Sequence, residues 1–95
     1  MSGMLSGKAL ITNHAGLHAR PAVKLTKLAK KFQAQISVRV AGAADWINAK
    51  SVAKIMAMRA AHGSTIEIKA SGSDAEAAVA ALVDLIATDF PDGAS

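Results

Sequence analysis

Segments with a two-residue apolar period alternate with segments of helical period, and this order constrains the fold more than any other feature of the chain. Short apolar or alternating runs predict strands, whereas stripes of apolar residues three or four positions apart predict helices. Strands are predicted at 8–12, 35–40, 46–47 and 64–70, and helices at 18–32, 52–59 and 73–90. The connections are short and the strand patterns are of the antiparallel type. The sequence therefore predicts an α+β fold of order β-α-β-β-α-β-α, with helices covering one face of a four-stranded sheet.

Local signals mark where the helices begin and end. Pro21 falls in the first turn of the first helix, where its missing N–H costs nothing and its fixed φ suits the helix. Ser73 and Glu76 have the spacing of a capping box, and they are predicted to open the last helix, which Pro91 ends. Glycine is typical of the position just after a helix, and Gly63 is therefore predicted to end the second helix.

Length and composition limit the classes of protein that fit. We expect one domain over residues 1–95, with an ordered core of about residues 7–90. The absence of Cys removes disulfides, thiolate metal sites and thiol nucleophiles. No apolar run approaches the roughly 18 residues needed to cross a bilayer, and the N-terminus lacks the basic and apolar regions of a signal peptide. The sequence predicts a cytoplasmic protein with no membrane insertion.

The net charge of +4 favours partners with acidic surfaces, either nucleic acid or an acidic face of another protein. RNA-binding proteins that use a sheet need aromatic residues on its strands. Here Phe32 falls in a predicted helix and Phe90 near the C-terminus, which leaves only Trp46 for a strand. A small basic nucleic-acid-binding module is thus the weaker alternative. We expect protein partners and no nucleic acid.

His18 has the most distinctive setting of the 3 histidines. Segment 16–22 runs from loop to helix, which places the His18 ring at a helix N-terminus, beside backbone N–H groups without intrahelical partners. Such an end favours anions, and Arg20 adds a planar guanidinium suited to phosphate oxygens. A nucleophile, free donors and a guanidinium together favour phosphoryl transfer. On local physics alone, a helix cap or an ordinary surface histidine remains an alternative interpretation of His18.

The other candidate sites have less support. His14 lies in a turn-like segment, and His62 is predicted to be a solvated loop residue. No second cluster of His, Asp or Glu has metal-ligand spacing, and we expect no metal ion. The sequence contains no Ser/His/Asp set, no pair of catalytic carboxylates and no Gly-rich phosphate loop. We also expect no cofactor.

The second predicted helix offers a regulatory position and a docking patch. Ser51 opens this helix, where its simplest role is that of an N-cap. A phosphate on Ser51 would suit the helix end but would add negative charge to a surface that docks partners. Val52, Ile55 and Met56 form the apolar stripe, and any of them that faces outward would add to a patch beside His18. The residues expected to contact partners are Ala19, Val23, Lys27, Val52 and Met56.

Two segments resemble the motifs of a known family, the HPr phosphocarriers of the bacterial phosphoenolpyruvate:sugar phosphotransferase system. Segment 16–22, GLHARPA, is similar to the family's active-site motif without a substitution. Segment 48–51, NAKS, is similar to the signature around its regulatory serine. The spacing of the motifs, the order of elements and the length also match. The resemblance covers nearly the whole chain, and it implies an open-faced β-sandwich with three helices on one side of a four-stranded antiparallel sheet.

The resemblance implies a carrier of phosphohistidine. His18 matches the histidine whose Nδ1 accepts a phosphoryl group from enzyme I, which phosphoenolpyruvate charges, and donates it to an enzyme IIA-type acceptor during sugar transport. Arg20 matches the arginine that neutralises phosphate charge. Ser51 matches the serine that, in some bacteria, a kinase and a phosphatase modify and restore. Such a protein is a phosphoryl carrier rather than a stand-alone turnover enzyme, and we expect a monomer.

Some features depart from the usual HPr pattern. Ala15 stands where many members have a small polar residue, and Trp46 before the second motif is unusual, as is the Ala-rich last helix. These features resemble HPr-like domains within multiphosphoryl-transfer proteins, including those that serve dihydroxyacetone kinase. Such a domain is the alternative to a free-standing carrier of sugar transport.

Overall fold

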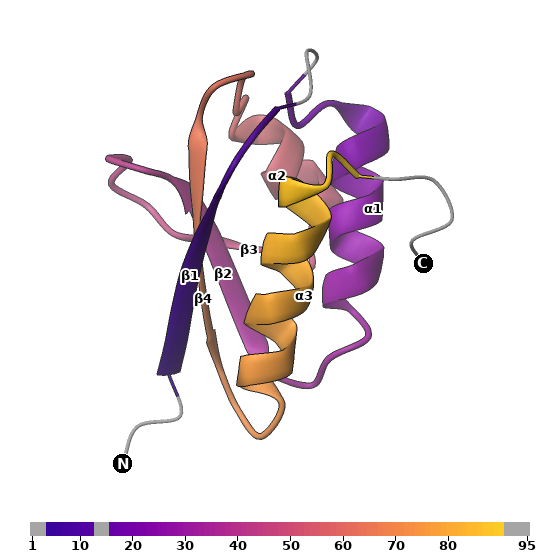
Figure 1. Ribbon diagram of the computed structural model, residues 1–95, viewed down its shortest axis with the longest axis vertical. Coiled ribbons are helices and arrows are strands. Elements are labelled where there is room, and N and C mark those ends of the chain that lie inside the picture. Colours follow the sequence, from indigo (N-terminus) through magenta and orange to yellow (C-terminus); the bar gives the residue numbers. More distant parts are fainter. Residues whose placement is uncertain (1–3, 13–15, 91–95) are drawn as a thin grey trace.

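The helices and strands follow the predicted order in the computed structural model, which describes residues 4–12 and 16–90. The elements are β1 (Met4–Leu10), α1 (Ala19–Ala29), β2 (Gln35–Val40), β3 (Ile47–Asn48), α2 (Val52–Ala57), β4 (Thr65–Ser71) and α3 (Ala75–Ala87). The four strands form one antiparallel sheet in the order β1-β4-β2-β3. All three helices lie on one face of this sheet (Figure 1). The predicted α+β fold, with one open face of the sheet, is confirmed.

A single apolar core fills the space between the sheet and the helices. Successive strand residues point to opposite faces, so that Ile36 and Val38 of β2 and every second residue of β4 are buried against the helices. Helix α3 packs across β1 and β4, and α1 packs beside α2 and α3. The large side chains that are fully buried are Ile11, Leu25, Val38, Ile55, Ile66, Ile68, Leu82 and Ile86. Each such aliphatic side chain contributes about 1.5–3 kcal/mol of transfer free energy.

The edge strand β1 passes close to α3 at Gly7. A Cβ atom on Gly7 would lie 2.9 Å from Val79 Cγ1 and 3.1 Å from Val83 Cγ2. Glycine is therefore required for the close approach of this strand to the helix. The prediction treated the residues before Lys8 as a flexible start, whereas the strand begins at Met4 and ends at Leu10.

All three helices end earlier than predicted. The first ends at Ala29 rather than continuing to Phe32. The second ends before Arg59, whose φ is 53°, and the third ends before Asp89 and Phe90, with φ values of 63° and 51°. A right-handed helix cannot continue through a left-handed residue. The apolar spacing continued past each end because a residue just outside a helix can still pack on the core.

The predicted capping box at Ser73 and Glu76 is wrong. Asp74 is the N-cap residue of α3, and its side chain makes no cap hydrogen bond. Its carboxylate instead accepts hydrogen bonds from the backbone N–H groups of Gln33 and Ala34, both at 2.8 Å. These bonds, that from Gln33 most of all, lower the pKa of Asp74 from its ordinary value of 3.8. Through these hydrogen bonds, Asp74 connects the start of α3 to the segment between α1 and β2.

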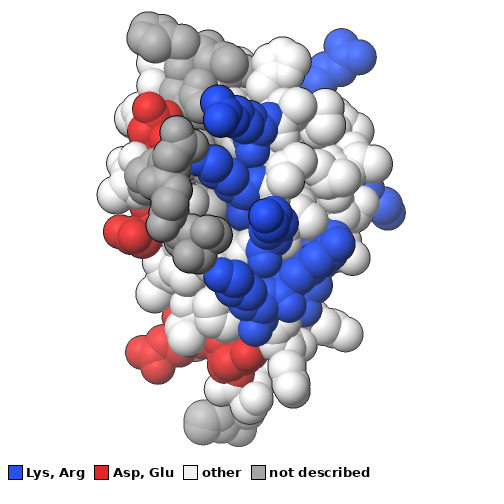
Figure 2. Space-filling view, turned by 90° about the vertical axis from the view of Figure 1, so that its right-hand side faces the viewer, with Lys and Arg blue, Asp and Glu red and all other residues white. Residues whose placement is uncertain are grey.

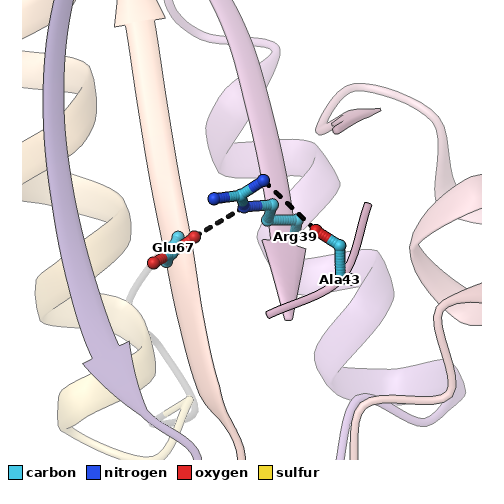
Figure 3. Close-up of polar contacts among 3 residues, drawn as sticks. All are labelled: Arg39, Ala43 and Glu67. Atoms are coloured by element: carbon cyan, nitrogen blue, oxygen red, sulfur yellow. Dashed lines mark hydrogen bonds and ion pairs between the residues drawn. The ribbon is translucent and has the colours of Figure 1, made fainter. Parts of the chain in front are cut away.

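On the open face of the sheet, Trp46 lies over two basic side chains. The guanidinium carbon of Arg39 and Lys69 Nζ each lie 4.4 Å from the centroid of the indole ring. Arg39 Nε also donates a hydrogen bond to Glu67 Oε1 at 2.6 Å, and Arg39 Nη1 donates one to the Ala43 carbonyl at 3.2 Å (Figure 3). Trp46 precedes β3, which begins one residue later than predicted. The cluster ties the β2–β3 turn to the sheet through cation–π contacts worth about 0.5–1 kcal/mol each at exposed sites.

Candidate functional site

His18 is the N-cap residue of α1. Its backbone is extended, with φ −81° and ψ −168°, and its side chain makes no capping hydrogen bond. Its carbonyl oxygen accepts the N–H of Ala22 at 2.9 Å, which is the first bond of the helix. The side chain is exposed. The backbone of His18 therefore starts the helix while its imidazole remains available to another molecule.

The two residues before His18 are fixed to the segment that follows α2. Leu17 is buried, and its N–H donates to the carbonyl oxygen of Ala60 at 2.9 Å. Gly16 has a φ of +69°, and a Cβ atom on it would lie 2.3 Å from the same oxygen. Only glycine meets both requirements without strain. His18 thus projects from a loop that is held on its N-terminal side by the core and on its C-terminal side by α1.

The first turn of α1 offers donors for an anion. The N–H groups of Ala19 and Arg20 have no intrahelical partner, as at any helix N-terminus, and Pro21 has no N–H. Pro21 is buried and lies in the first turn as predicted. The Arg20 side chain is exposed and makes no hydrogen bond or ion pair with any described residue. The structure places Arg20 and His18 together at one helix end, as the sequence predicted.

A shallow cleft of about 410 Å³ lies beside His18. Its lining residues are Leu17, His18, Met56, Arg59, Ala60 and Ala61. The described part of this lining includes no carboxylate and no hydroxyl. The prediction counted Arg59 among the helical positions of α2 and missed its place beside His18. No local signal in the sequence could have revealed it, because the contact joins two segments far apart in the chain.

All five residues predicted to contact partners are exposed. Ala19, Val23 and Lys27 lie on α1, and Val52 and Met56 lie on α2, which packs beside α1. The exposed fractions of Val23, Val52 and Met56 are 45%, 37% and 40%, which are high values for large apolar side chains. The third residue of the α2 stripe, Ile55, is fully buried. Apolar groups on two adjacent helices therefore face solvent, and one of them, Met56, lines the cleft beside His18.

Ser51 caps α2 as predicted. Its side-chain oxygen accepts the N–H of Lys54 at 3.3 Å, and the residue is half-buried. The preceding Lys50 is held by its Nζ, which donates to the carbonyl oxygen of Phe32 at 2.7 Å. A group added to Ser51 would therefore change the beginning of the same helix that carries Val52 and Met56.

Basic side chains gather on the side of the molecule that α1 occupies. Figure 2 shows them as a band, with acidic side chains at its margin. The basic residues of α1 and the turn after it are Arg20, Lys24, Lys27, Lys30 and Lys31. A band of one charge sign attracts an acidic surface and accelerates the encounter with it.

The sequence also led to expectations about a metal site, a membrane span and the other two histidines. The described residues contain no group of three or more His, Cys, Asp or Glu side chains that could hold a metal ion. In residues 4–12 and 16–90, no helix has the length and apolar character that a membrane span requires. His62 is exposed in the loop after α2. His14 and Ala15 lie outside the described residues.

Comparison with known proteins gives the family. Residues 5–88 match the family described as the PTS HPr component phosphorylation site. The chain belongs to the HPr family. The phosphocarrier protein HPr of Cupriavidus necator is 39% identical over 90 residues, which are 95% of this chain and 99% of that protein. The crystal structure of HPr-C-His from Thermoanaerobacter tengcongensis has a TM-score of 0.83 and 40% identity, covering 90% of this chain and 94% of that chain.

HPr-like sequence also occurs within longer proteins. The multiphosphoryl transfer protein of Salmonella typhimurium is 35% identical over 92 residues, which are 96% of this chain but 24% of that protein. The predicted family is confirmed by these matches, and with it the general role of an HPr phosphocarrier of the phosphotransferase system. The similarity extends both to short phosphocarriers and to one segment of a longer transfer protein.

Proposed function

We propose that this chain accepts a phosphoryl group from phospho-enzyme I on His18 and passes it to an enzyme IIA-type acceptor. One observation carries the proposal: an exposed imidazole lies at the N-terminus of α1, and the exposed Arg20 follows it in the first turn of the same helix. Helix-end N–H groups and a guanidinium both favour the negative charge of a phosphoryl group. The imidazole supplies the nucleophile, and the helix-end N–H groups and the guanidinium stabilise the phosphoryl group that the imidazole carries.

The transfer balances without any further reactant. A ring nitrogen of His18, Nδ1 by the family resemblance, forms a bond to phosphorus with its lone pair, while the bond from phosphorus to the donor's histidine breaks. The bonding electrons return to the donor's imidazole. The second transfer repeats this exchange with His18 as the donor. Because each step exchanges one P–N bond for another, it is close to thermoneutral, and positioning with charge neutralisation provides most of the catalysis.

A carrier must also keep water from hydrolysing its phosphohistidine. The described lining of the cleft beside His18 includes no carboxylate or hydroxyl that could act as a general base on water. The cleft therefore suits a group that is held until a partner arrives. Arg20 is proposed to bind the phosphoryl oxygens and to neutralise their charge.

The partners are proposed to dock on α1 and α2. Val23, Val52 and Met56 supply exposed apolar area beside His18, and Lys27 adds positive charge. An apolar centre with a charged margin is typical of protein interfaces. Donor and acceptor would use the same surface in turn. Ser51, at the beginning of α2, is proposed as the position where a kinase and phosphatase regulate docking.

We further propose a cytoplasmic monomer, since a carrier must leave one partner to reach the next. An HPr from Thermoanaerobacter tengcongensis has been crystallised as a dimer. Sedimentation velocity at concentrations from micromolar to millimolar will decide the matter for this chain. A constant monomeric mass is expected, and a concentration-dependent dimer would contradict it.

The first experiment measures phosphorylation directly. The protein is incubated with phosphoenolpyruvate and a bacterial enzyme I, and its intact mass is determined before and after mild acid. One acid-labile phosphate is expected on the wild type and on His62→Ala, and none on His18→Ala. A phosphate that persists in His18→Ala would contradict the assignment of the carrier residue.

The similarity to a multiphosphoryl transfer protein supports a second candidate, an HPr-like domain of such a protein. Service of a dihydroxyacetone kinase by this domain is proposed from the family resemblance of the sequence. The two candidates differ in donor and acceptor rather than in chemistry. The phosphorylated chain is offered in parallel to an enzyme IIA of sugar transport and to the phosphotransfer component of a dihydroxyacetone kinase system. Faster loss of phosphate to enzyme IIA supports the first candidate, and faster loss to the kinase system supports the second.

A further inference from the structure

Arg59 belongs to the segment after α2, far in the sequence from the residues that begin α1. It lines the same cleft as His18, together with Leu17 and Met56. Its position is fixed by the backbone, because the N–H of Arg59 donates to the Met56 carbonyl at 3.1 Å and the next residue, Ala60, accepts the N–H of Leu17 at 2.9 Å. The segment that carries Arg59 is thus bonded to the loop that carries His18.

The side chain of Arg59 has no structural partner in the described part of the molecule. It is exposed and makes no hydrogen bond or ion pair with residues 4–12 or 16–90. Arg20 is in the same situation at the beginning of α1. Two guanidinium groups with unused donors therefore belong to the surroundings of one imidazole, Arg59 through the shared cleft and Arg20 two residues after His18 in the chain. Five N–H donors on each guanidinium suit the oxygens of a phosphoryl group.

The backbone at Arg59 is strained for an arginine. Its φ of 53° belongs to the left-handed region, which glycine adopts without cost and a longer side chain does not. Residues kept in such conformations are concentrated at functional sites, where the side chain is needed in spite of the strain. A cation after a short helix also interacts with the helix dipole, but this effect requires neither the left-handed backbone nor a place in the cleft.

We propose that Arg59 is a second phosphate-binding arginine, whose guanidinium donates hydrogen bonds to the phosphoryl group on His18 from within the cleft that both residues line. This inference rests on the proposed function of His18 as the phosphoryl acceptor. The phosphoryl group carries two negative charges when fully ionised, and the guanidinium groups of Arg20 and Arg59 together would neutralise both. Arg59 would act in the transition state of each transfer, when the phosphoryl oxygens move between two imidazoles.

The test compares steady-state transfer from phospho-enzyme I to the wild type, Arg59→Gly, Arg59→Lys and Lys54→Gln. Arg59→Gly removes the guanidinium and relieves the backbone strain, so the melting temperature of this variant should equal or exceed that of the wild type. Lysine keeps the charge on the same backbone. Lys54→Gln removes one exposed charge from α2 at a residue that does not line the His18 cleft.

The expected result is a kcat at least about tenfold lower for Arg59→Gly with little change in KM, partial recovery with lysine, and wild-type values for Lys54→Gln. A stable Arg59→Gly variant with wild-type kcat, a change confined to KM, or no recovery with lysine would each overturn the inference. If the wild type accepts no phosphate, the proposed function itself fails, and the role of Arg59 fails with it.

Discussion

The amide N–H of Leu17 donates to the carbonyl oxygen of Ala60 at 2.9 Å, and this bond joins the two halves of the site. It fixes the residue before His18 to the segment that follows α2. The position of the imidazole relative to Arg59 and Met56 thus depends on a contact between distant parts of the chain, rather than on α1 alone. Errors of about 1 Å in such positioning cost large factors in rate.

The first prediction concerns Gly16→Ala. A Cβ at this position would lie 2.3 Å from the Ala60 carbonyl oxygen at a φ of +69°, so the loop must move away and the Leu17 bond must weaken. We expect a loss of at least about 1–2 kcal/mol in stability and a slower transfer to His18. Thermal unfolding and the enzyme I assay measure the two effects.

Gly42→Ala is the control for Gly16→Ala. Gly42 also has a positive φ, +90°, but a Cβ there would meet nothing within 4 Å. The substitution Gly42→Ala therefore introduces the strain of a left-handed alanine without displacing a neighbouring residue. Equal losses of stability and unchanged transfer rates in the two variants would contradict the role of the Leu17–Ala60 contact.

The second prediction concerns Arg20. Its side chain makes no bond to a described residue, so Arg20→Ala should leave the free energy of unfolding within about 0.5 kcal/mol of the wild type. Loss of one donor group to the transferred phosphoryl should lower kcat by about 100-fold. Lysine should recover part of the rate, since it keeps the charge but not the planar fork. Lys30→Ala, which removes an equal charge farther along the basic band, should retain wild-type kcat.

The third prediction concerns the docking surface. Val23→Glu places a carboxylate among the exposed apolar groups of α1 and α2, and we expect enzyme I to show a KM about tenfold higher for this variant. Leu10→Glu is the matched control, because Leu10 is 51% exposed on the open face of the sheet, compared with 45% for Val23 on α1. An equal rise in KM for both variants would indicate a general effect of charge rather than docking on α1.

The order of the helices and strands could be predicted because each element depends on the spacing of apolar residues along a short stretch of sequence. The arrangement of the strands in one sheet followed from that order. His18 and Arg20 could be predicted for the same reason, since the motif that places them at a helix end is continuous in the sequence. The place of Arg59 beside His18 could not be predicted, because the cleft is formed by two segments that are far apart in the chain and are joined by the bond between Leu17 and Ala60. No local pattern carries that information.

The errors at Gly7 and Asp74 have the same physical origin. Gly7 lies in a segment whose composition is that of a flexible chain end, yet it belongs to a regular strand that passes close to Val79 of α3. The capping-box spacing after Ser73 is a local signal. It was outweighed by the hydrogen bonds that the Asp74 carboxylate accepts from the distant residues Gln33 and Ala34. Tertiary contacts overrode local preference at both positions.

The fourth prediction separates the two roles of Ser51. Ser51→Ala removes the oxygen that accepts the Lys54 N–H, and the loss of an N-cap costs about 0.5–2 kcal/mol. Aspartate is itself a good N-cap, so Ser51→Asp should keep most of the stability while it adds charge beside Val52 and Met56. We therefore expect weaker binding of enzyme I by Ser51→Asp and normal binding by Ser51→Ala, measured by calorimetry. Ser73→Asp adds the same charge at an exposed residue before α3, and weaker binding by this control would remove the special role of Ser51.

The fifth prediction concerns stability in acid. The N–H groups of Gln33 and Ala34 bind the ionised carboxylate of Asp74 and hold its pKa below 3.8. The unfolded state therefore binds a proton more readily than the folded state, so this contribution is fully present above pH 3.8 and is lost as pH falls through the lower folded value. Asp74→Asn should be less stable than the wild type at neutral pH, and the difference should shrink in stronger acid. Asp84→Asn is the control variant for the loss of one carboxylate, because the side chain of Asp84 is exposed on α3 and bonds to no described residue. Urea unfolding between pH 7 and pH 2.5 measures both variants, and a gap for Asp74→Asn that stays constant over this range would contradict the proposed bonds.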